Sequence, residues 1–257
     1  MLVSHPGFSV FEFDLPDALL KRLIEVLDGM LGEHLTVENV LSNVEEKQGV
    51  YQLFLNNDLV YIGKTDAQAG LRKRLARHAE KILDRPNLSP QSVTFRAVQI
   101  LVFTAMDLEI GLIQHYTETD RKPRWNGSGF GSNDLGRERD TTRYNEDHFD
   151  RIYPIDTAIL RYYLETGTYT VASVLGIIKD KVRYTLRFQN AGGNLRAAHP
   201  DLRETRIDIA DAPQSVDELL RGMIDVLPVG WQATVLPGHV ILYQENKSYA
   251  SGVTIRK

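Results

Sequence analysis

The stretch that decides the fold is GVYQLFLNNDLVYIG, residues 49–63. Two apolar runs rich in β-forming residues flank the polar cluster NND, residues 56–58, and this pattern is typical of a β-hairpin. If residues 56–58 form the loop, Leu53 faces Tyr61, and Tyr51 faces the glycine that ends the stretch. Because side chains alternate faces along a strand, Tyr51 and Tyr61 then share one face as a diagonal pair, roughly 7–8 Å apart. A loop with an even number of residues would place them on opposite faces.

A basic segment, AGLRKRLARH at residues 69–78, follows the hairpin. Its apolar positions, such as Leu71 and Leu75, fall on one face of a helix at about 100° per residue. Arg74 and His78 lie at the border of that face, where a side chain is anchored by the core and its polar head reaches the surface. For Arg74 alone, the simpler interpretation is a surface arginine lying over apolar neighbours. The hairpin upstream makes a functional role the favoured interpretation.

A carboxylate, Glu109, lies in the segment DLEIGLI, residues 107–113. At helical spacing it shares a face with Leu112 and Tyr116. A carboxylate in an apolar stripe is unfavourable unless a cation or hydrogen bonds compensate its charge. Two interpretations are open: an edge position paired with a lysine or arginine, or a ligand for a divalent metal ion, which prefers hard carboxylate oxygens.

In chain order, the elements between Gly49 and Asn126 resemble the GIY-YIG nuclease superfamily. They are the triplets GVY (49–51) and YIG (61–63), Arg74 with His78 after it, Glu109 on the following helix, and Asn126 in the sequence PRWN. Val50 stands where the family name has isoleucine, and the loop before the arginine is longer than in the shortest members of the family. Neither difference changes a residue that takes part in the reaction. The resemblance implies an α+β fold, with a small mixed or antiparallel sheet and flanking helices.

The same resemblance implies a hydrolase that cleaves the phosphodiester bonds of DNA with Mg²⁺ or Mn²⁺. Glu109 would hold the metal ion, and Arg74 would neutralise charge on the phosphoryl oxygens. Tyr51 would position or deprotonate the attacking water. A free phenol has a pKa of about 10, so a cation must favour its phenolate, and Lys64 is the nearest in sequence. Tyr61 and His78 would orient the phosphate or the water. Asn126 would hold the site together through hydrogen bonds.

A narrower resemblance, to the GIY-YIG type II restriction endonucleases, extends beyond Asn126. It consists of Trp125-Asn126, Gly129-Phe130-Gly131, Asp134, Gly136 and Arg139. It implies a homodimer that cuts double-stranded DNA at a short palindrome, because cutting both strands symmetrically needs two active sites. It also implies a companion methyltransferase or another partner of a defence system. Base readout would fall to arginines of the glycine-rich segment, for which the candidates are Arg124, Arg137, Arg139 and Arg143.

Two other functions stay open. One is a structure-specific or nicking nuclease of repair or of a mobile element. The other is a non-catalytic DNA-binding module, which would show itself by a missing tyrosine, arginine or glutamate in the motifs. None is missing.

The charge of the chain is unevenly distributed. The net charge is −4, but residues 64–85 hold seven basic residues against three acidic ones, a balance of +4. A local positive stripe can attract a phosphate backbone even on an acidic protein. The 257 residues include no cysteine, no apolar run long enough to span a bilayer, and no signal-peptide pattern at Met1. We therefore expect a cytoplasmic protein without a membrane partner.

The periodicity predicts two domains with a boundary near residue 156. Residues 1–155 would form the nuclease domain, including a helix over 14–31 that Asp14 begins. Residues 156–257 would form a second small α+β domain for DNA targeting or association. Its predicted elements are helices over 156–165 and 215–226 and strands near 184–188, 205–209, 232–235 and 240–243.

Overall fold

The computed structural model describes residues 4–9, 14–65, 70–101, 108–132, 134, 136–192 and 197–256. The chain divides into two compact units and passes between them at residues 78/79, within helix α3, at residues 90/91 and at residues 126/127. One unit comprises residues 1–78 and 91–126, and the other comprises residues 79–90 and 127–257. Both units combine helices with small sheets, so the predicted α+β class is confirmed. Within the described ranges, no helix is both long and apolar enough to cross a membrane.

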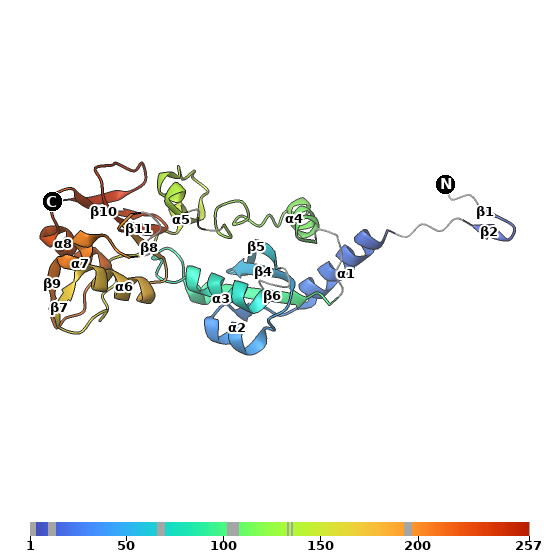
Figure 1. Cartoon of the computed structure of the whole chain (residues 1–257). Helices are drawn as coiled ribbons and strands as arrows, with labels where there is room; N and C mark the ends of the chain where they lie inside the picture. The colour runs from blue at the N-terminus through green and yellow to red at the C-terminus, as the bar shows by residue number, and fades with distance from the viewer. Residues whose placement is uncertain are drawn as a thin grey trace. The chain divides into compact units, whose positions relative to one another are not determined.

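The first unit is built on a four-stranded antiparallel sheet with the strand order β3-β6-β4-β5. Figure 1 labels its strands β4, β5 and β6. The strands are β3 (Glu33–His34), β4 (Gly49–Leu55), β5 (Asp58–Thr65) and β6 (Val93–Gln99). The helices are α1 (Leu15–Gly29), α2 (Val37–Asn43), α3 (Leu71–Lys81) and α4 (Leu108–Glu118), and a short hairpin, β1 (Ser4–His5) and β2 (Phe8–Ser9), precedes them. Asp14 caps α1 as predicted, since its side chain accepts a hydrogen bond from the Asp17 amide.

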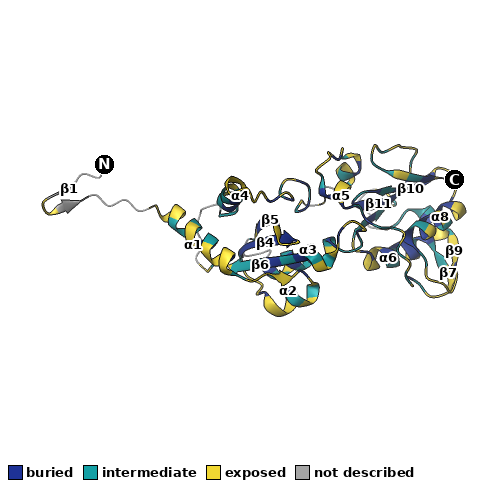
Figure 2. Ribbon diagram, turned by 180° about the vertical axis from the view of Figure 1, so that it is seen from behind, coloured by how far each residue is buried: buried dark blue, intermediate teal, exposed yellow. Residues whose placement is uncertain are grey.

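The central strands are buried on both faces, and β4 is dark blue along its length in Figure 2. One face packs on α1 and α4, where Val50 and Ile62 meet Leu27 and Leu112 in a single core. The opposite face carries Tyr51 and packs on α3. A strand covered on both sides reads as a nearly continuous apolar run, which is what the sequence of β4 shows.

The hairpin differs from the prediction in its loop but keeps the predicted tyrosine register. Asn56 and Asn57 form a two-residue loop with φ values of 51° and 71°, the left-handed conformation that such tight hairpin turns require and asparagine tolerates. The predicted three-residue loop is therefore wrong. A register shift leaves Val60 as an extra residue on β5 and restores the pairing, so that Leu53 faces Tyr61 and Tyr51 faces Gly63.

The second unit contains a four-stranded sheet with the order β12-β10-β11-β8, in which β8 runs parallel to β11, and a two-stranded sheet of β7 and β9. Its strands are β7 (Gly167–Thr170), β8 (Thr185–Phe188), β9 (Arg206–Ile209), β10 (Trp231–Leu236), β11 (His239–Gln244) and β12 (Val253–Arg256). Its helices are α5 (Phe149–Ile152), α6 (Val171–Lys181), α7 (Pro200–Glu204), α8 (Val216–Val226) and the 3₁₀ turn η2 (Gly136–Thr141), while the 3₁₀ turn η1 (Pro90–Ser92) lies at the edge of the first unit.

The predicted elements of this unit are confirmed except for one helix. The strands match β8, β9, β10 and β11, and α8 begins at a capping box of Ser215 and Glu218. The helix predicted over 156–165 is wrong. Arg161 instead forms a backbone bridge to Gln214 and an ion pair with Asp84. These tertiary contacts outweigh a weak local helical preference.

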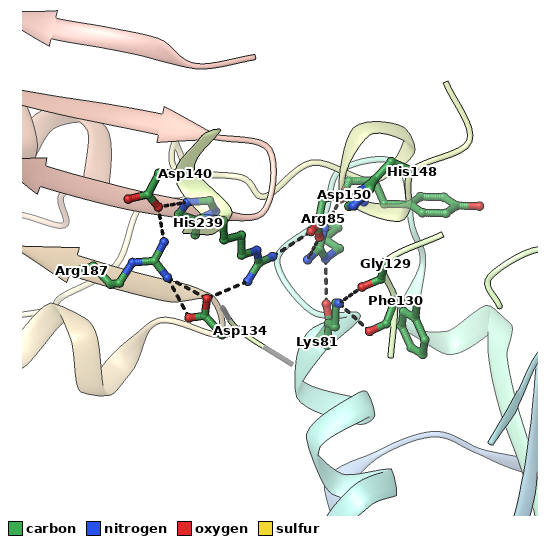
Figure 3. Close-up of polar contacts among 12 residues, drawn as sticks. Lys81, Arg85, Gly129, Phe130, Asp134, Asp140, His148, Asp150, Arg187 and His239 are labelled. Atoms are coloured by element: carbon green, nitrogen blue, oxygen red, sulfur yellow. Dashed lines mark hydrogen bonds and ion pairs between the residues drawn. The ribbon is translucent and has the colours of Figure 1, made fainter. Parts of the chain in front are cut away.

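The last passage of the chain between the units lies at residues 126 and 127, whereas the sequence predicts a domain boundary at residues 155 and 156. A network of buried charges explains the difference (Figure 3). Asp150 accepts hydrogen bonds from Arg85 (3.0 Å) and Arg139 (2.9 Å). Asp140 pairs with Arg187 of β8 and accepts from Nε2 of His239 of β11 at 2.8 Å. Burial lowers the pKa of His239 to about 4, so the ring is neutral at pH 7 and donates that proton. The segment that reads as a glycine-rich loop is thus bonded to the C-terminal sheet.

We expect Asp150→Ala to lower the free energy of unfolding of the second unit by about 3–5 kcal/mol, because it leaves buried cations without their partner. The Asp150 side chain is fully buried. Burial alone would raise the pKa of Asp150, but Lys81, Arg85 and Arg139 outweigh it and hold the pKa below its usual 3.8. The stabilisation is therefore complete at neutral pH and is lost as the pH falls through the folded-state pKa.

Urea unfolding measures this effect in a Trp125→Phe background, where the remaining tryptophan, Trp231, reports on the second unit. The matched control is Asp147→Ala, which removes an exposed carboxylate from the same segment and should change the free energy by less than about 0.5 kcal/mol. Equal effects of the two substitutions would show that the network adds no stability.

Candidate active site

Four of the residues singled out in the sequence form one cluster on the α3 side of the hairpin. Tyr51 Oη lies 2.8 Å from Nε2 of His78. Arg74 donates from Nε to the same oxygen at 3.4 Å. The Tyr61 ring centre lies 6.0 Å from that of Tyr51 and 5.5 Å from that of His78. The spacing of four residues places Arg74 and His78 on consecutive turns of α3, so both reach the same phenol.

The two motif glycines are required by close packing. The Tyr51 ring lies directly over Gly63, and a Cβ atom there would overlap its hydroxyl and ring carbons. A Cβ atom on Gly49 would overlap the carbonyl oxygen of Val98 on β6 and lie 2.7 Å from Cδ1 of Leu71. Any larger residue at either position must displace the tyrosine or separate the strand from its neighbours.

The environment of Tyr51 favours the neutral phenol. Its side chain is fully buried. Burial raises the pKa of Tyr51 above its ordinary 10.0, neighbouring Tyr61 raises it further, and the hydrogen bond from Arg74 only partly opposes them. At neutral pH, Tyr51 therefore carries its proton and can donate it to His78 Nε2, which requires the ring tautomer protonated on Nδ1.

Lys64 is not the cation at this phenol. Its Nζ lies 4.0 Å from Glu109 Oε2, and the two side chains are 49% and 24% exposed. Strand alternation puts Lys64 on the face of β5 opposite Tyr61. The sequence-based expectation that Lys64 favours a Tyr51 phenolate is therefore corrected, since Arg74 is the cation that contacts the phenol.

The predicted residues thus form two groups on opposite faces of β5. Because the Tyr51 ring covers Gly63 and the next residue is Lys64, both groups lie at the same end of the strand. A phosphodiester that contacts both groups has to lie across this end. The pairing of Glu109 with a lysine matches the simpler interpretation of that carboxylate, but at 4.0 Å between partly exposed groups it is weak and open to competition.

The residues at this end of β5 are compatible with a Mg²⁺ ion that is completed by substrate. The described part of the chain contains no group of three or more histidine, aspartate or glutamate side chains that could hold a metal ion. Glu109 would be the single protein ligand. Mg²⁺ commonly retains several waters and takes one or two carboxylates together with substrate phosphates. A partly exposed single carboxylate fits this pattern.

Asn126 closes the open edge of the sheet. Its side-chain oxygen accepts from the Ile62 amide at 2.8 Å, and its side-chain nitrogen donates to the Ile62 carbonyl at 2.8 Å. The neighbouring Trp125 amide donates to the Val60 carbonyl at 2.7 Å. The Asn126 amide therefore replaces a partner strand at the residue between Tyr61 and Gly63.

We expect Asn126→Ala to lower the free energy of unfolding of the first unit by about 1–3 kcal/mol, because the amide and carbonyl of Ile62 both lose their partner. Asn126→Asp should cost at least as much, because it keeps the acceptor for the Ile62 amide but places a carboxylate oxygen against the Ile62 carbonyl, where the amide nitrogen now donates. Urea unfolding in a Trp231→Phe background reports on the first unit through Trp125. Asn43→Ala, at an exposed position in the same unit, is the control, and an equal loss in that variant would refute the edge-closing role.

Sequence reasoning missed Arg77, which lies one turn beyond Arg74. Burial and repulsion by Arg74 lower the pKa of Arg77, and the Tyr51 and Tyr61 hydroxyls partly offset them. The spacing of three residues between the two arginines was the available signal. Two of the arginines predicted to read bases have different surroundings. Arg139 is held by Asp150, while Arg137 stacks on Tyr243 in the second unit.

Comparison of the sequence with protein-family models and with curated proteins finds no match to either.

Proposed function

We propose that this protein is a divalent-metal-dependent DNA endonuclease. The observation that carries the proposal is the cluster of Tyr51, Tyr61, Arg74 and His78, in which two phenols, a guanidinium and an imidazole converge. Glu109, at the same end of β5, adds a partly exposed carboxylate that could hold the metal ion. Groups of this kind bind a phosphate, move a proton and neutralise developing negative charge.

Proton transfer is the role of Tyr51 and His78. The neutral phenol takes a proton from the attacking water as its own proton moves to Nε2 of His78, so that no isolated phenolate forms. The water oxygen bonds to phosphorus, the bond from phosphorus to the 3′ oxygen breaks, and that leaving oxygen takes up a proton from solvent. This order follows from the raised pKa of Tyr51 and from the 2.8 Å separation of the two atoms.

Charge stabilisation is the role of Arg74, which is half-buried and already donates to Tyr51. Its remaining donors can contact the phosphoryl oxygens as negative charge develops on them. Tyr61 orients the phosphate. Glu109 lies on the opposite face of β5, where its carboxylate would hold a Mg²⁺ or Mn²⁺ ion. When bound, the ion supplies Lewis-acid polarisation of the phosphate. Lys64 would then exchange its carboxylate partner for a phosphate oxygen.

Within this class, a restriction enzyme is our leading proposal. It would be a homodimer that cuts double-stranded DNA in the cytoplasm, with a companion methyltransferase protecting the host's sites. The experiment is digestion of supercoiled and random-sequence plasmids with Mg²⁺, with Mn²⁺ and with a chelator, followed by sequencing of the ends. Discrete sites with 5′-phosphate ends, lost on chelation or on prior methylation, support the proposal.

Other outcomes of the same digestion assign a different function. Nicks or cuts confined to branched DNA point to a structure-specific nuclease. Metal-independent binding without any cleavage by the purified full chain would make the protein a DNA-binding module and overturn the proposal. Sedimentation with and without DNA tests the dimer.

A further inference from the structure

The second unit contains a cavity of about 690 Å³, remote in sequence from the tyrosine cluster. It is lined by Arg137 of η2, Lys179 of α6, Phe188 and Gln189 at the end of β8, and Tyr243 of β11. A cavity of this size falls within the range of small-molecule sites in proteins. The residue types are those that contact nucleotides rather than apolar ligands.

The lining of this cavity is cationic. Arg137, Lys179 and Arg187 are its charged members, and the described residues that line it include no carboxylate. Arg187 is neutralised from outside the cavity by Asp134, at 2.8 Å, and by Asp140. Arg137 and Lys179 are exposed, so their positive charge remains available for an anion.

Two planar surfaces face the same space. The Arg137 guanidinium lies over the Tyr243 ring, 4.3 Å from its centre, and its Nη2 donates to Gln189 Oε1 at 2.7 Å, which fixes the position of the group. Phe188 is half-buried, with Lys179 Nζ 5.8 Å from its ring centre. Nucleobases stack on phenyl rings and on guanidinium planes, and amides such as those of Gln189 and Asn190 bond to base edges.

We propose that this cavity binds one nucleotide, with its base against Phe188 or the Arg137 plane and its phosphate at Lys179 and the Arg137 edge. The ligand is either an unstacked nucleotide of a DNA strand or a free nucleotide. The DNA source rests on the proposed nuclease function, whereas the nucleotide class rests on the cavity alone. As a DNA site, it would give the second unit its targeting role by holding one unstacked nucleotide of the substrate.

The test is binding by the full chain in a chelator, so that no cleavage is needed for the signal. Fluorescence anisotropy is measured with a labelled short single-stranded oligonucleotide, a duplex with one unpaired nucleotide, a fully paired duplex and a labelled deoxynucleotide. The variants are Phe188→Leu, which keeps apolar volume but removes the ring, and Arg137→Gln. The matched control is Arg203→Ala, which removes an exposed positive charge elsewhere in the second unit.

We expect both cavity variants to weaken binding of the unpaired nucleotide by about tenfold, as the loss of one stacking partner does, and Arg203→Ala to change it less than twofold. Loss confined to the labelled deoxynucleotide identifies a free nucleotide as the ligand. Equal losses in Arg203→Ala and Arg137→Gln, with Phe188→Leu unchanged, would overturn the proposal, because only general electrostatic attraction then remains. If the protein binds here without cutting any DNA, the nuclease proposal fails while this one stands.

Discussion

Tyr51→Phe should lower the single-turnover rate of DNA cleavage by about 10²–10⁴-fold, the range that a proton-transfer group contributes. The substitution removes one oxygen atom and leaves the buried ring over Gly63, so the packing of the sheet is unchanged. It also removes the hydrogen bond to His78, which should cost about 1 kcal/mol of stability and leave the protein folded. Quenched-flow cleavage of a labelled duplex, with circular dichroism to verify folding, measures both effects.

The control for this variant is Tyr162→Phe, which removes a phenolic oxygen from a tyrosine that is 65% exposed. Its cleavage rate should match that of the unmodified chain. If Tyr51→Phe also retained the full single-turnover rate, then another group would activate the water, and Tyr51 would have only a packing role.

Glu109→Gln should abolish metal-dependent cleavage, because a neutral amide of the same shape is a poor ligand for a hard cation. DNA binding in a chelator should be unchanged or tighter, since the substitution removes a negative charge and frees Lys64 for phosphate. Loss of cleavage with unchanged or tighter DNA binding would identify Glu109 as a metal ligand. A carboxylate that only pairs with a lysine would not give these opposite effects. Cleavage and anisotropy measurements on the same preparation provide the comparison.

Glu118→Gln is the matched control, because it makes the same change at an exposed position on α4 and keeps an acceptor for Gln114. It should leave both cleavage and binding unaltered. Cleavage by Glu109→Gln within tenfold of the unmodified chain would remove Glu109 from the metal role. The ion would then have to be held by other residues or by the substrate.

The two units suggest a division of labour that these experiments can resolve. The predicted catalytic residues all belong to the first unit. The second unit has its own core, its own buried charge network and a cationic cavity. Since a division lies at residues 126 and 127, the glycine-rich part of the chain beyond Asn126 belongs to the second unit, while Trp125 and Asn126 belong to the first. The proposed targeting role would therefore include residues 127–155 as well as the C-terminal sheet.

The sequence by itself determined the α+β class, the hairpin and most of its flanking elements. These features depend on local patterns: apolar alternation in β4 and β5, helical spacing in α3, and capping residues such as Asp14 and Ser215. It also placed Tyr51 and Tyr61 on one face, although for a partly wrong reason. The predicted odd loop is an even loop with an added bulge residue, Val60, and both give the same side-chain parity.

Only the tertiary structure decided which charges meet and where the units divide. Arg74 rather than Lys64 contacts Tyr51, because strand alternation turns Lys64 to the opposite face, toward Glu109. The environment of Tyr51 favours a neutral phenol because α3 covers the ring, and local sequence carries no measure of that burial. Residues 127–155 join the second unit because Asp140 and Asp150 find buried partners far along the chain. Such long-range pairings are set by the packing of complete elements, and no short pattern encodes them.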